Sequence, residues 1–417
     1  MRSDAATFWR NTASVLSGTM VAQAIPLVGT LIMARLYAPA HFGTFAAWLA
    51  IVTVLAVALT GRFEASLAVV DDGEARRTAF FATLTTTGLL GLTAALVVAT
   101  LSFSASAILG MPPLLATLLV PAAFAYALSQ SWESLAAAEG SYRWLSILRI
   151  IQASLILAIQ VGAGIFRPSA EGLACAFAIG VGLTLLVSSR VFPMVLPPAG
   201  ERWARLRAFW RDQRSFPMFA LPADTINTFS AQLPVLIVAS RFGADYAGYL
   251  AMTIRLLGAP VTLLGRSVLD VFKRYASVSF REKGHCREEY LQTLRTLALG
   301  ALAFCIAMLI AGKTAFVLLL GSKWAMAGEI AIWLLPLFSL RFVASPLSYT
   351  FYIVGKQHVD LVWQIALLAM TVATLNIAAS PDVALKTYTY GYSLLYLAYI
   401  YLSYRCSLGM KPMKSMV

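Results

Sequence analysis

Four arginines lie within or at the ends of long apolar stretches of this sequence. Arg255 and Arg341 stand in the middle of such stretches, and Arg62 and Arg266 each follow a glycine at the end of one. A charge inside a membrane costs several kcal/mol unless it faces water or a partner. A guanidinium group binds a phosphate through two parallel hydrogen bonds. The four arginines therefore predict a site for an anionic, phosphate-bearing ligand.

Acidic and amide residues accompany these arginines. Glu64 follows Arg62 by two residues, and Glu133 lies late in an apolar stretch. Asp224 and Asn227 are three residues apart, which places them on one face of a helix. We expect these four residues to line a cavity or to couple transport to protons or sodium ions.

Two structural alternatives remain for the charged residues. One is a salt bridge between neighbouring helices, for example Asp224 with Arg255. The other applies to Arg62 and Arg266, whose long side chains could reach the lipid head groups as membrane anchors.

The sequence lacks the motifs of common catalytic sites. It contains no GxxxxGK[ST], GxGxxG, HExxH or GxSxG pattern, and its four cysteines are scattered without metal-binding spacing. We therefore expect no enzymatic activity, no cofactor and no metal.

Composition identifies the elements that position these residues. The 417 residues are 59% hydrophobic and 12% charged, with a mean hydropathy of +0.77, whereas an average soluble domain is about 25% charged. This excludes an ordinary soluble enzyme, a disordered chain and, despite the net charge of +13, a nucleic-acid-binding protein. The sequence predicts an all-α, polytopic membrane protein with about twelve transmembrane helices of about 20 residues each. The predicted spans are 12–34, 42–61, 79–102, 113–133, 145–166, 170–189, 217–239, 246–265, 292–312, 325–345, 361–380 and 384–404.

The distribution of Lys and Arg predicts the orientation of the chain. Most of them fall in alternate loops, which places both termini in the cytoplasm. Two of these inside loops, 190–216 and 266–291, are long enough to hold amphipathic helices at the membrane surface. Such helices would either bind a partner enzyme or lipid head groups, or simply anchor and orient the protein. Their apolar faces are predicted to be Trp203, Leu206 and Phe209 in the first loop, and Val268, Phe272 and Tyr275 in the second.

The two halves of the sequence resemble each other. Leu31–Ala46 aligns with Leu236–Ala251 at an offset of 205 residues, and Gly61-Arg62 pairs with Gly265-Arg266 one residue out of register. Proline and glycine interrupt the corresponding first and seventh spans, which is typical of a transport site. We expect two six-helix bundles around a central cavity, at 1–200 and 217–417, joined by a cytoplasmic linker at 201–216.

Several stretches resemble one known family. The segment Leu31-Ile-Met-Ala-Arg-Leu-Tyr-Ala-Pro-Ala-His-Phe-Gly-Thr-Phe45 is similar to the first-loop signature of polysaccharide (O-antigen type) flippases. These belong to the multidrug/oligosaccharidyl-lipid/polysaccharide exporter superfamily. The order and spacing of the later similar stretches agree with this family. They are Thr60–Glu64 with Asp71–Ala75, Phe216–Pro234 and Gly321–Gly328.

The resemblance implies a function as well as a fold. It implies alternating-access transport of an undecaprenyl-diphosphate-linked oligosaccharide across a bacterial inner membrane, for surface polysaccharide export. Arg62 and Glu64 match the family's Arg-x-Glu stretch and Asp224 its Pro-x-Asp stretch, so these three are expected to line a cationic cavity. The expected partners are the lipid-linked oligosaccharide, membrane lipid and assembly proteins such as a polysaccharide polymerase, with no nucleic acid.

Two alternatives belong to other functional classes. An ion-coupled drug or small-molecule exporter of the same superfamily would favour acidic residues at membrane depth, where arginines outnumber them here. A membrane enzyme such as a polysaccharide polymerase or ligase would require a large outside loop, and the predicted outside loops are short.

Overall fold

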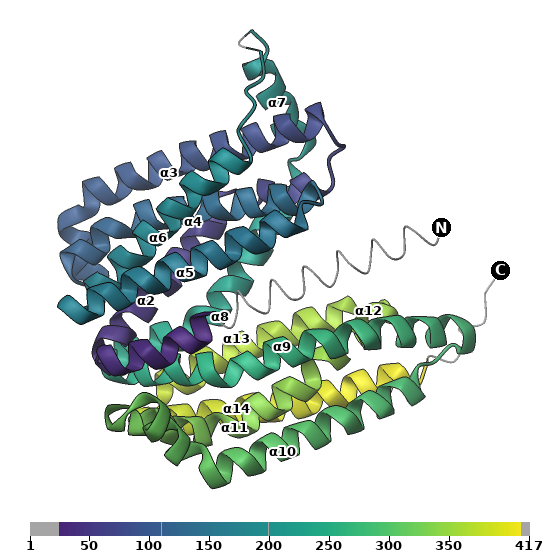
Figure 1. The fold of residues 1–417 in the computed structure, drawn as a ribbon. Coiled ribbons are helices and arrows are strands. Elements are labelled where there is room, and N and C mark those ends of the chain that lie inside the picture. Colours follow the sequence, from purple (N-terminus) through teal and green to yellow (C-terminus); the bar gives the residue numbers. More distant parts are fainter. Residues whose placement is uncertain (1–24, 110, 199, 410–417) are drawn as a thin grey trace. The chain divides into compact units, whose positions relative to one another are not determined.

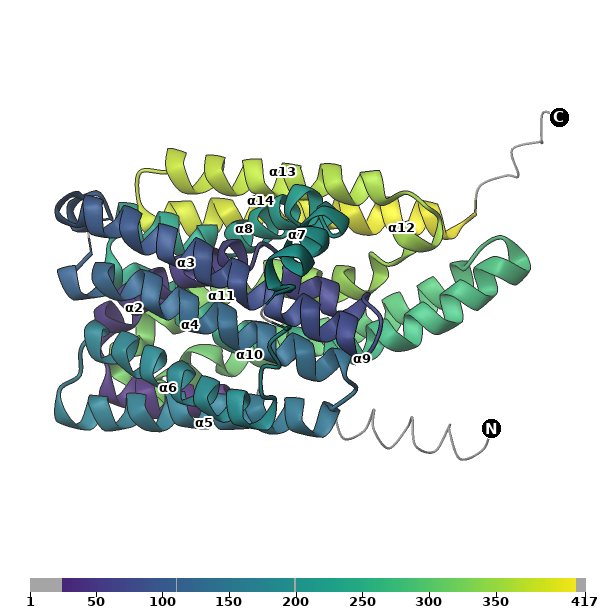
Figure 2. The ribbon, with the colours of Figure 1, turned by 90° about the horizontal axis from the view of Figure 1, so that it is seen from above.

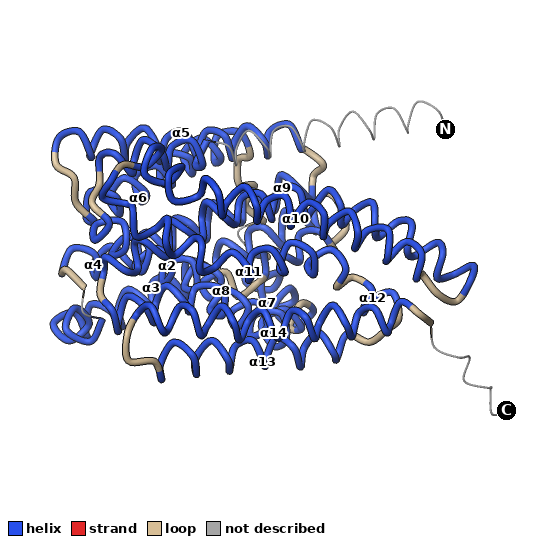
Figure 3. Tube along the Cα trace, turned by 90° about the horizontal axis from the view of Figure 1, so that it is seen from below, coloured by secondary structure: helices blue, strands red, loops and turns tan. Residues whose placement is uncertain are grey.

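The computed structural model describes residues 25–109, 111–198 and 200–409, and helices connected by short loops form almost all of this part (Figure 3). No strand occurs in it. Eight of its helices are long and apolar enough to cross a bilayer, and Ile25–Leu36 is a shorter apolar helix. The predicted all-α membrane fold is therefore confirmed.

The chain forms two compact units, Met1–Leu236 and Ile237–Val417. The predicted division into bundles at 200 and 217 stays a prediction. In the first unit, η1 is a 3₁₀ helix and η2 is a single π-helical turn. After the helix Ile25–Leu36 come α2 (Pro39–Leu59), η1 (Phe63–Ala68), α3 (Glu74–Leu109), α4 (Pro113–Ala138), α5 (Tyr142–Phe166), α6 (Ala170–Val191), α7 (Arg202–Asp212), η2 (Phe216–Ala220) and α8 (Leu221–Phe242), whose last residues enter the second unit (Figure 1).

The second unit is built from longer helices. Its α9 has 40 residues and its α10 has 34. The elements are α9 (Ala244–Lys283), α10 (Arg287–Leu320), η3 (Ser322–Trp324), α11 (Ala325–Leu347), α12 (Thr350–Ile353), α13 (Gln357–Ile377) and α14 (Pro381–Ser407), as Figure 2 shows from above.

Each predicted span coincides with a helix, except that residues 12–24 of the first span lie outside the described residues. The prediction for 266–291 was wrong in one respect. This segment is no separate surface helix, because α9 continues to Lys283 without a break. The helix stops only at Gly284, whose φ of +74° ends it in the left-handed conformation.

The two predicted apolar faces also need correction. In α7, Leu206 and Phe209 are buried in the protein core, while Trp203 is 55% exposed. In the extension of α9, Phe272 is buried and Tyr275 is 61% exposed. Both segments pack on other helices of their own unit. The buried residues Leu206, Phe209 and Phe272 therefore contact protein, where we expected contact with the membrane surface.

Polar and small side chains fix the helices of the first unit against one another. The Tyr37 hydroxyl donates to the backbone oxygen of Gln160 at 2.6 Å, and Trp48 Nε1 donates to that of Leu115 at 2.9 Å. A Cβ at Gly180 would lie 2.9 Å from the backbone of Ile156, so α5 and α6 meet too closely there for a side chain.

The internal repeat is visible in the backbone. The helix break before α2 has its N-cap at Ala38, and the break before α9 has its N-cap at Gly243. These positions are related by the same offset of 205 residues that relates the two sequences. After these equivalent breaks the halves differ, because α2 ends at Leu59 whereas α9 continues past Gly265.

Candidate functional site

A strained turn follows α2 and holds the first candidate arginine. Gly61 has a φ of +58° and Arg62 a φ of +60°, and Arg62 is the one non-glycine residue with positive φ in the described part of the chain. This conformation costs an ordinary residue about 1–2 kcal/mol. The Thr60 hydroxyl supports the turn, because it accepts from Arg62 N at 3.2 Å and donates to the backbone oxygen of Val57 at 3.0 Å. Such strain is found most often at functional sites.

The turn places the Arg62 guanidinium between two carboxylates. Its Nη1 donates to Glu64 Oε1 at 2.7 Å, and its Nε lies 2.7 Å from Asp224 Oδ2. Asp224 therefore pairs with Arg62, and the salt bridge with Arg255 that we considered stays an untested alternative. The two contacts join η1 to the first turn of α8 within the first unit. The guanidinium is also engaged inside the protein, which does not fit the alternative of a head-group anchor.

The two carboxylates differ in their surroundings. Glu64 is only 4% exposed, whereas the Asp224 side chain is 39% exposed. Within the described residues, Glu64 Oε2 is buried and has no hydrogen-bond partner. A buried charge depends strongly on its partner, whereas a contact near the surface is weak and easily exchanged. The contact of Arg62 with Asp224 is therefore more easily exchanged than its contact with Glu64.

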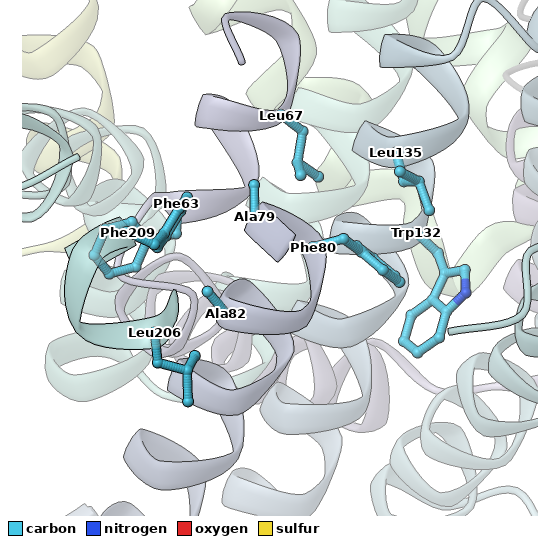
Figure 4. Close-up of a cluster of buried hydrophobic side chains, with 9 residues drawn as sticks. All are labelled: Phe63, Leu67, Ala79, Phe80, Ala82, Trp132, Leu135, Leu206 and Phe209. Carbon is cyan, nitrogen blue, oxygen red and sulfur yellow. The ribbon is translucent and has the colours of Figure 1, made fainter. Parts of the chain in front are cut away.

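The residues next to Arg62 are held by α7 and α3. The Phe63 ring packs on Phe209 of α7, with ring centroids 5.2 Å apart, and both belong to a buried cluster with Leu206 (Figure 4). On the other side of η1, Arg76 Nε donates to Leu67 O and Nη2 to Val70 O, both at 3.1 Å. These bonds satisfy carbonyl groups that the end of η1 leaves without partners.

Further polar contacts fix α7 to α3. Trp210 Nε1 donates to Thr86 Oγ1 at 2.9 Å, and the Arg205 guanidinium pairs with Glu74 as well as with Glu201 of its own segment. The hydrogen bonds that Arg205 donates to Glu74 and Glu201 raise the pKa of Arg205 above its ordinary value. α7 thus belongs to the same compact unit as Arg62.

The first unit also holds the predicted site residues Glu133 and Asn227. Glu133 of α4 forms an ion pair with Arg149 of α5, with Oε2 and Nε 2.9 Å apart. This is a salt bridge between neighbouring helices, the kind of contact that we considered for Asp224. Asn227 is exposed on α8, one turn after Asp224.

The second unit contains the other three arginines. Arg255 is half-buried on α9, and Arg266 also lies on α9, where its side chain is outside the described part of the structure. Arg341 is exposed on α11 and interacts electrostatically with tyrosines of α14. The tyrosines are Tyr388, Tyr392 and Tyr396.

Sequence reasoning found Arg62, Glu64 and Asp224 but missed the residues that hold them. Arg76 is one of many basic residues in the predicted inside segments, and Phe209 was expected on the apolar face of a helix at the membrane surface. The helical spacing of Leu206 and Phe209 was a usable signal, yet spacing alone does not distinguish a lipid-facing surface from a protein-facing one. No cluster of metal-binding side chains occurs among the residues that the structure describes.

Comparison with known proteins supports the fold and the family. The lipid II flippase MurJ, in an inward-closed conformation, matches with a TM-score of 0.73 at 12% identity, over 94% of this chain and 87% of that chain. An inward-facing multidrug resistance transporter of the MATE family, in the MOP superfamily, matches with a TM-score of 0.67 at 14% identity, over 93% of this chain and 95% of that chain.

A MOP superfamily transporter from Pyrococcus furiosus, described by the reverse polarity of its binding pocket, has a TM-score of 0.59 at 16% identity, with 95% of each chain covered. These likenesses show a shared fold. No curated protein matches the sequence. The family model described as polysaccharide biosynthesis protein matches residues 32–329, which is most of the chain. The chain therefore belongs to the polysaccharide biosynthesis protein family.

Proposed function

We propose that this protein is a flippase for a lipid-linked oligosaccharide of the undecaprenyl-diphosphate type. It would move this lipid across a bacterial inner membrane by alternating access, with both termini cytoplasmic, for the export of surface polysaccharide. The observation on which this depends most is the Arg62 guanidinium, held in a strained turn between Glu64 and Asp224. The family membership and the fold shared with a lipid II flippase support it.

The geometry suggests how a diphosphate would bind. Asp224 is the more exposed partner of Arg62, so a phosphate oxygen would replace its carboxylate at Nε. Glu64 would stay bound at Nη1 and keep the guanidinium plane oriented. A guanidinium prefers this planar, two-point recognition of phosphate. The apolar lipid tail would remain in the bilayer, where it needs no protein contact.

The same exchange provides a means of ion coupling. When the diphosphate binds Arg62, Asp224 loses its cationic partner, and a coupling cation would take the place of the guanidinium. Release of the diphosphate would restore the ion pair and expel that cation. Glu64, with one buried oxygen lacking a partner in the described residues, is the second candidate for ion coupling.

The other candidate residues take secondary roles in this proposal. Arg255, Arg266 and Arg341 would add positive charge along the path of the diphosphate. Glu133 and Asn227 would line the path without direct contact to phosphate, because Glu133 already pairs with Arg149.

Reconstitution into liposomes tests this function. We expect the purified protein to move a fluorescent undecaprenyl-diphosphate oligosaccharide between leaflets, measured by quenching of the accessible leaflet. Arg62→Ala, Arg255→Ala and Arg341→Ala should each slow this movement without reducing the amount of folded protein. A protein that transports cationic drugs but leaves the lipid-linked sugar in its leaflet is an exporter of the MATE type, and this result would contradict the proposal.

A further inference from the structure

The segment around α7, which the charge distribution predicts to be cytoplasmic, has a second face that is exposed. Leu206 and Phe209 face the core, as described above, and Arg205 is paired with Glu74. The opposite face of α7 is defined by Trp203, Arg207 and Arg211 at four-residue spacing, and all three are exposed. Residues four apart lie on one side of a helix, so these three form a continuous stripe.

Aromatic and cationic groups are combined on this stripe. The Arg207 guanidinium lies 5.0 Å above the centroid of the Trp203 ring. Arg214, two residues after the end of α7, is also exposed and continues the stripe. Within the described residues, neither Arg207 nor Arg214 is in an ion pair, and Arg211 contacts only its exposed neighbour Asp212, at 3.2 Å. The stripe therefore presents positive charge outward.

The loop before α7 adds exposed apolar side chains. Met194, Val195 and Leu196 lie in this loop, and all three side chains are exposed. They begin three residues after α6 ends at Val191, so they lie within a few residues of a predicted membrane span. Figure 1 shows α7 and this loop projecting sideways from the helices of the first unit, rather than continuing along their direction.

We propose that this surface, defined as Met194–Leu196 with Trp203, Arg207, Arg211 and Arg214, binds the anionic phospholipids of the cytoplasmic leaflet. The apolar loop residues would enter the boundary between head groups and acyl chains. Trp203 would lie at head-group level, where its apolar ring and N–H are both satisfied. The three arginines would bind lipid phosphates, since the negative surface potential of this leaflet attracts basic segments close to a membrane span.

Other occupants fit these observations less well. A second copy of the chain would place arginine against arginine across the contact. A soluble acidic protein would match the arginines, but it would leave Met194, Val195 and Leu196 exposed at the level of the membrane. A free phosphate ion would need no apolar residues at all. The combination of a projecting apolar loop with a tryptophan and arginines matches a bilayer surface.

Quenching of Trp203 by brominated lipids tests this assignment. The full chain is placed in nanodiscs that contain either brominated phosphatidylglycerol or brominated phosphatidylcholine at equal mole fraction. The emission of Trp203 is obtained as the difference between the wild type and Trp203→Phe. We expect brominated phosphatidylglycerol to quench this emission several-fold more strongly than brominated phosphatidylcholine.

The arginines are tested by a matched pair of triple variants. Arg207→Gln/Arg211→Gln/Arg214→Gln should remove the preference for phosphatidylglycerol. Arg274→Gln/Arg281→Gln/Arg287→Gln, which removes the same charge from exposed positions of the α9–α10 hairpin, should leave it unchanged. This measurement involves no transported substrate, so its result is independent of the proposed flippase activity.

Four results would overturn the proposal. They are equal quenching by the two lipids, a preference that survives the first triple variant, absence of quenching by either lipid, and loss of the preference when inorganic phosphate is added. The third result would show that the surface faces water and a protein partner, and the fourth would show a simple phosphate site.

Discussion

The same position of the internal repeat has two different structures in the two halves. In the first half, the helix that starts after Ala38 stops at Leu59, and Gly61-Arg62 forms a left-handed turn. In the second half, the helix that starts after Gly243 passes through Gly265-Arg266 and continues to Lys283. The first half therefore has an ion-paired arginine in a strained turn at this position, and the second half has a long continuous helix.

Packing after the shared dipeptide explains this difference. In the first half, Phe63 and Leu67 are buried in the cluster that includes α7, which stabilises the short η1 helix. In the second half, Phe272 is buried against Tyr290 of α10, with ring centroids 6.4 Å apart. The Tyr290 hydroxyl in turn lies 2.7 Å from Ser403 Oγ of α14. Each backbone path is therefore stabilised by its own neighbours and not by the Gly-Arg sequence.

The largest predicted effect is the loss of the arginine from the strained turn. Arg62→Ala should lower the rate of lipid-linked oligosaccharide transport by about ten- to a hundredfold, because hydrogen bonds to charged groups contribute about 1.5–3 kcal/mol each. Arg62→Lys should also be impaired, since an ammonium group cannot reproduce the two-point geometry of guanidinium. Transport is measured in liposomes, with the exposed Arg287→Ala as a control. If both Arg62 variants transport at the wild-type rate, the turn in the first half has no special role in transport.

The second largest effect is expected when Phe209, whose ring packs on Phe63 beside the Arg62 turn, is truncated. Phe209→Ala removes a buried ring and should cost about 3–5 kcal/mol of stability in the first unit. It should also reduce transport, because Phe63 and the Arg62 turn lose their packing partner. Thermal unfolding in detergent and transport are measured together, with Trp203→Ala on the exposed side of α7 as the matched control. If Phe209→Ala and Trp203→Ala have equal effects, the packing of α7 does not support the turn.

The two glycines at the divergent position should respond to alanine with opposite signs. Gly61→Ala places a Cβ at positive φ and 3.3 Å from the Phe63 ring, which should destabilise the protein by about 1–2 kcal/mol. Gly265→Ala lies inside a helix with no atom within 4 Å of the new Cβ, so it should stabilise by about 0.5–1 kcal/mol. The midpoint of thermal unfolding distinguishes them. A shift in the same direction for both would mean that the backbones at Gly61 and Gly265 do not differ as described.

The smallest effect concerns a thiol at the end of the long second-half helix pair. Burial raises the pKa of Cys286 to about 11, so little reactive thiolate exists near neutral pH. Maleimide labelling of Cys286 should be far slower in the folded than in the denatured protein, and its rate should rise with pH up to about 11. Because the folded pKa is raised, this thiol contributes stability below pH 9 that is lost as the pH rises through about 11. Equal labelling of the two states would show that the α9–α10 hairpin is not packed at its tip.

Much of the fold follows from the sequence, because long apolar runs have one stable arrangement in a membrane. The predicted segments coincide with helices wherever the structure describes them, and the offset between Ala38 and Gly243 was present in the aligned halves. The end of α9 could not be predicted in the same way. Residues 266–283 are charged, yet they contain no helix-breaking residue before Gly284, so polarity marked the end of the apolar span but not the end of the helix.

The candidate site was predictable in part. The proximity of Arg62 and Glu64 follows from their two-residue spacing, but their contact with Asp224 depends on how η1 and α8 pack. The partner of Glu133 could not be predicted either, because only the packing of α4 against α5 brings Arg149 to it. Long-range pairing of this kind is decided by tertiary structure and not by local pattern.

Binding of undecaprenyl diphosphate to the protein in nanodiscs tests the central claim most directly. If the diphosphate replaces Asp224 at Arg62, Arg62→Ala should weaken binding by about tenfold or more. Asp224→Asn should instead strengthen binding, because it removes the competing carboxylate. Unchanged affinity in Arg62→Ala, or equal weakening in both variants, would contradict the account.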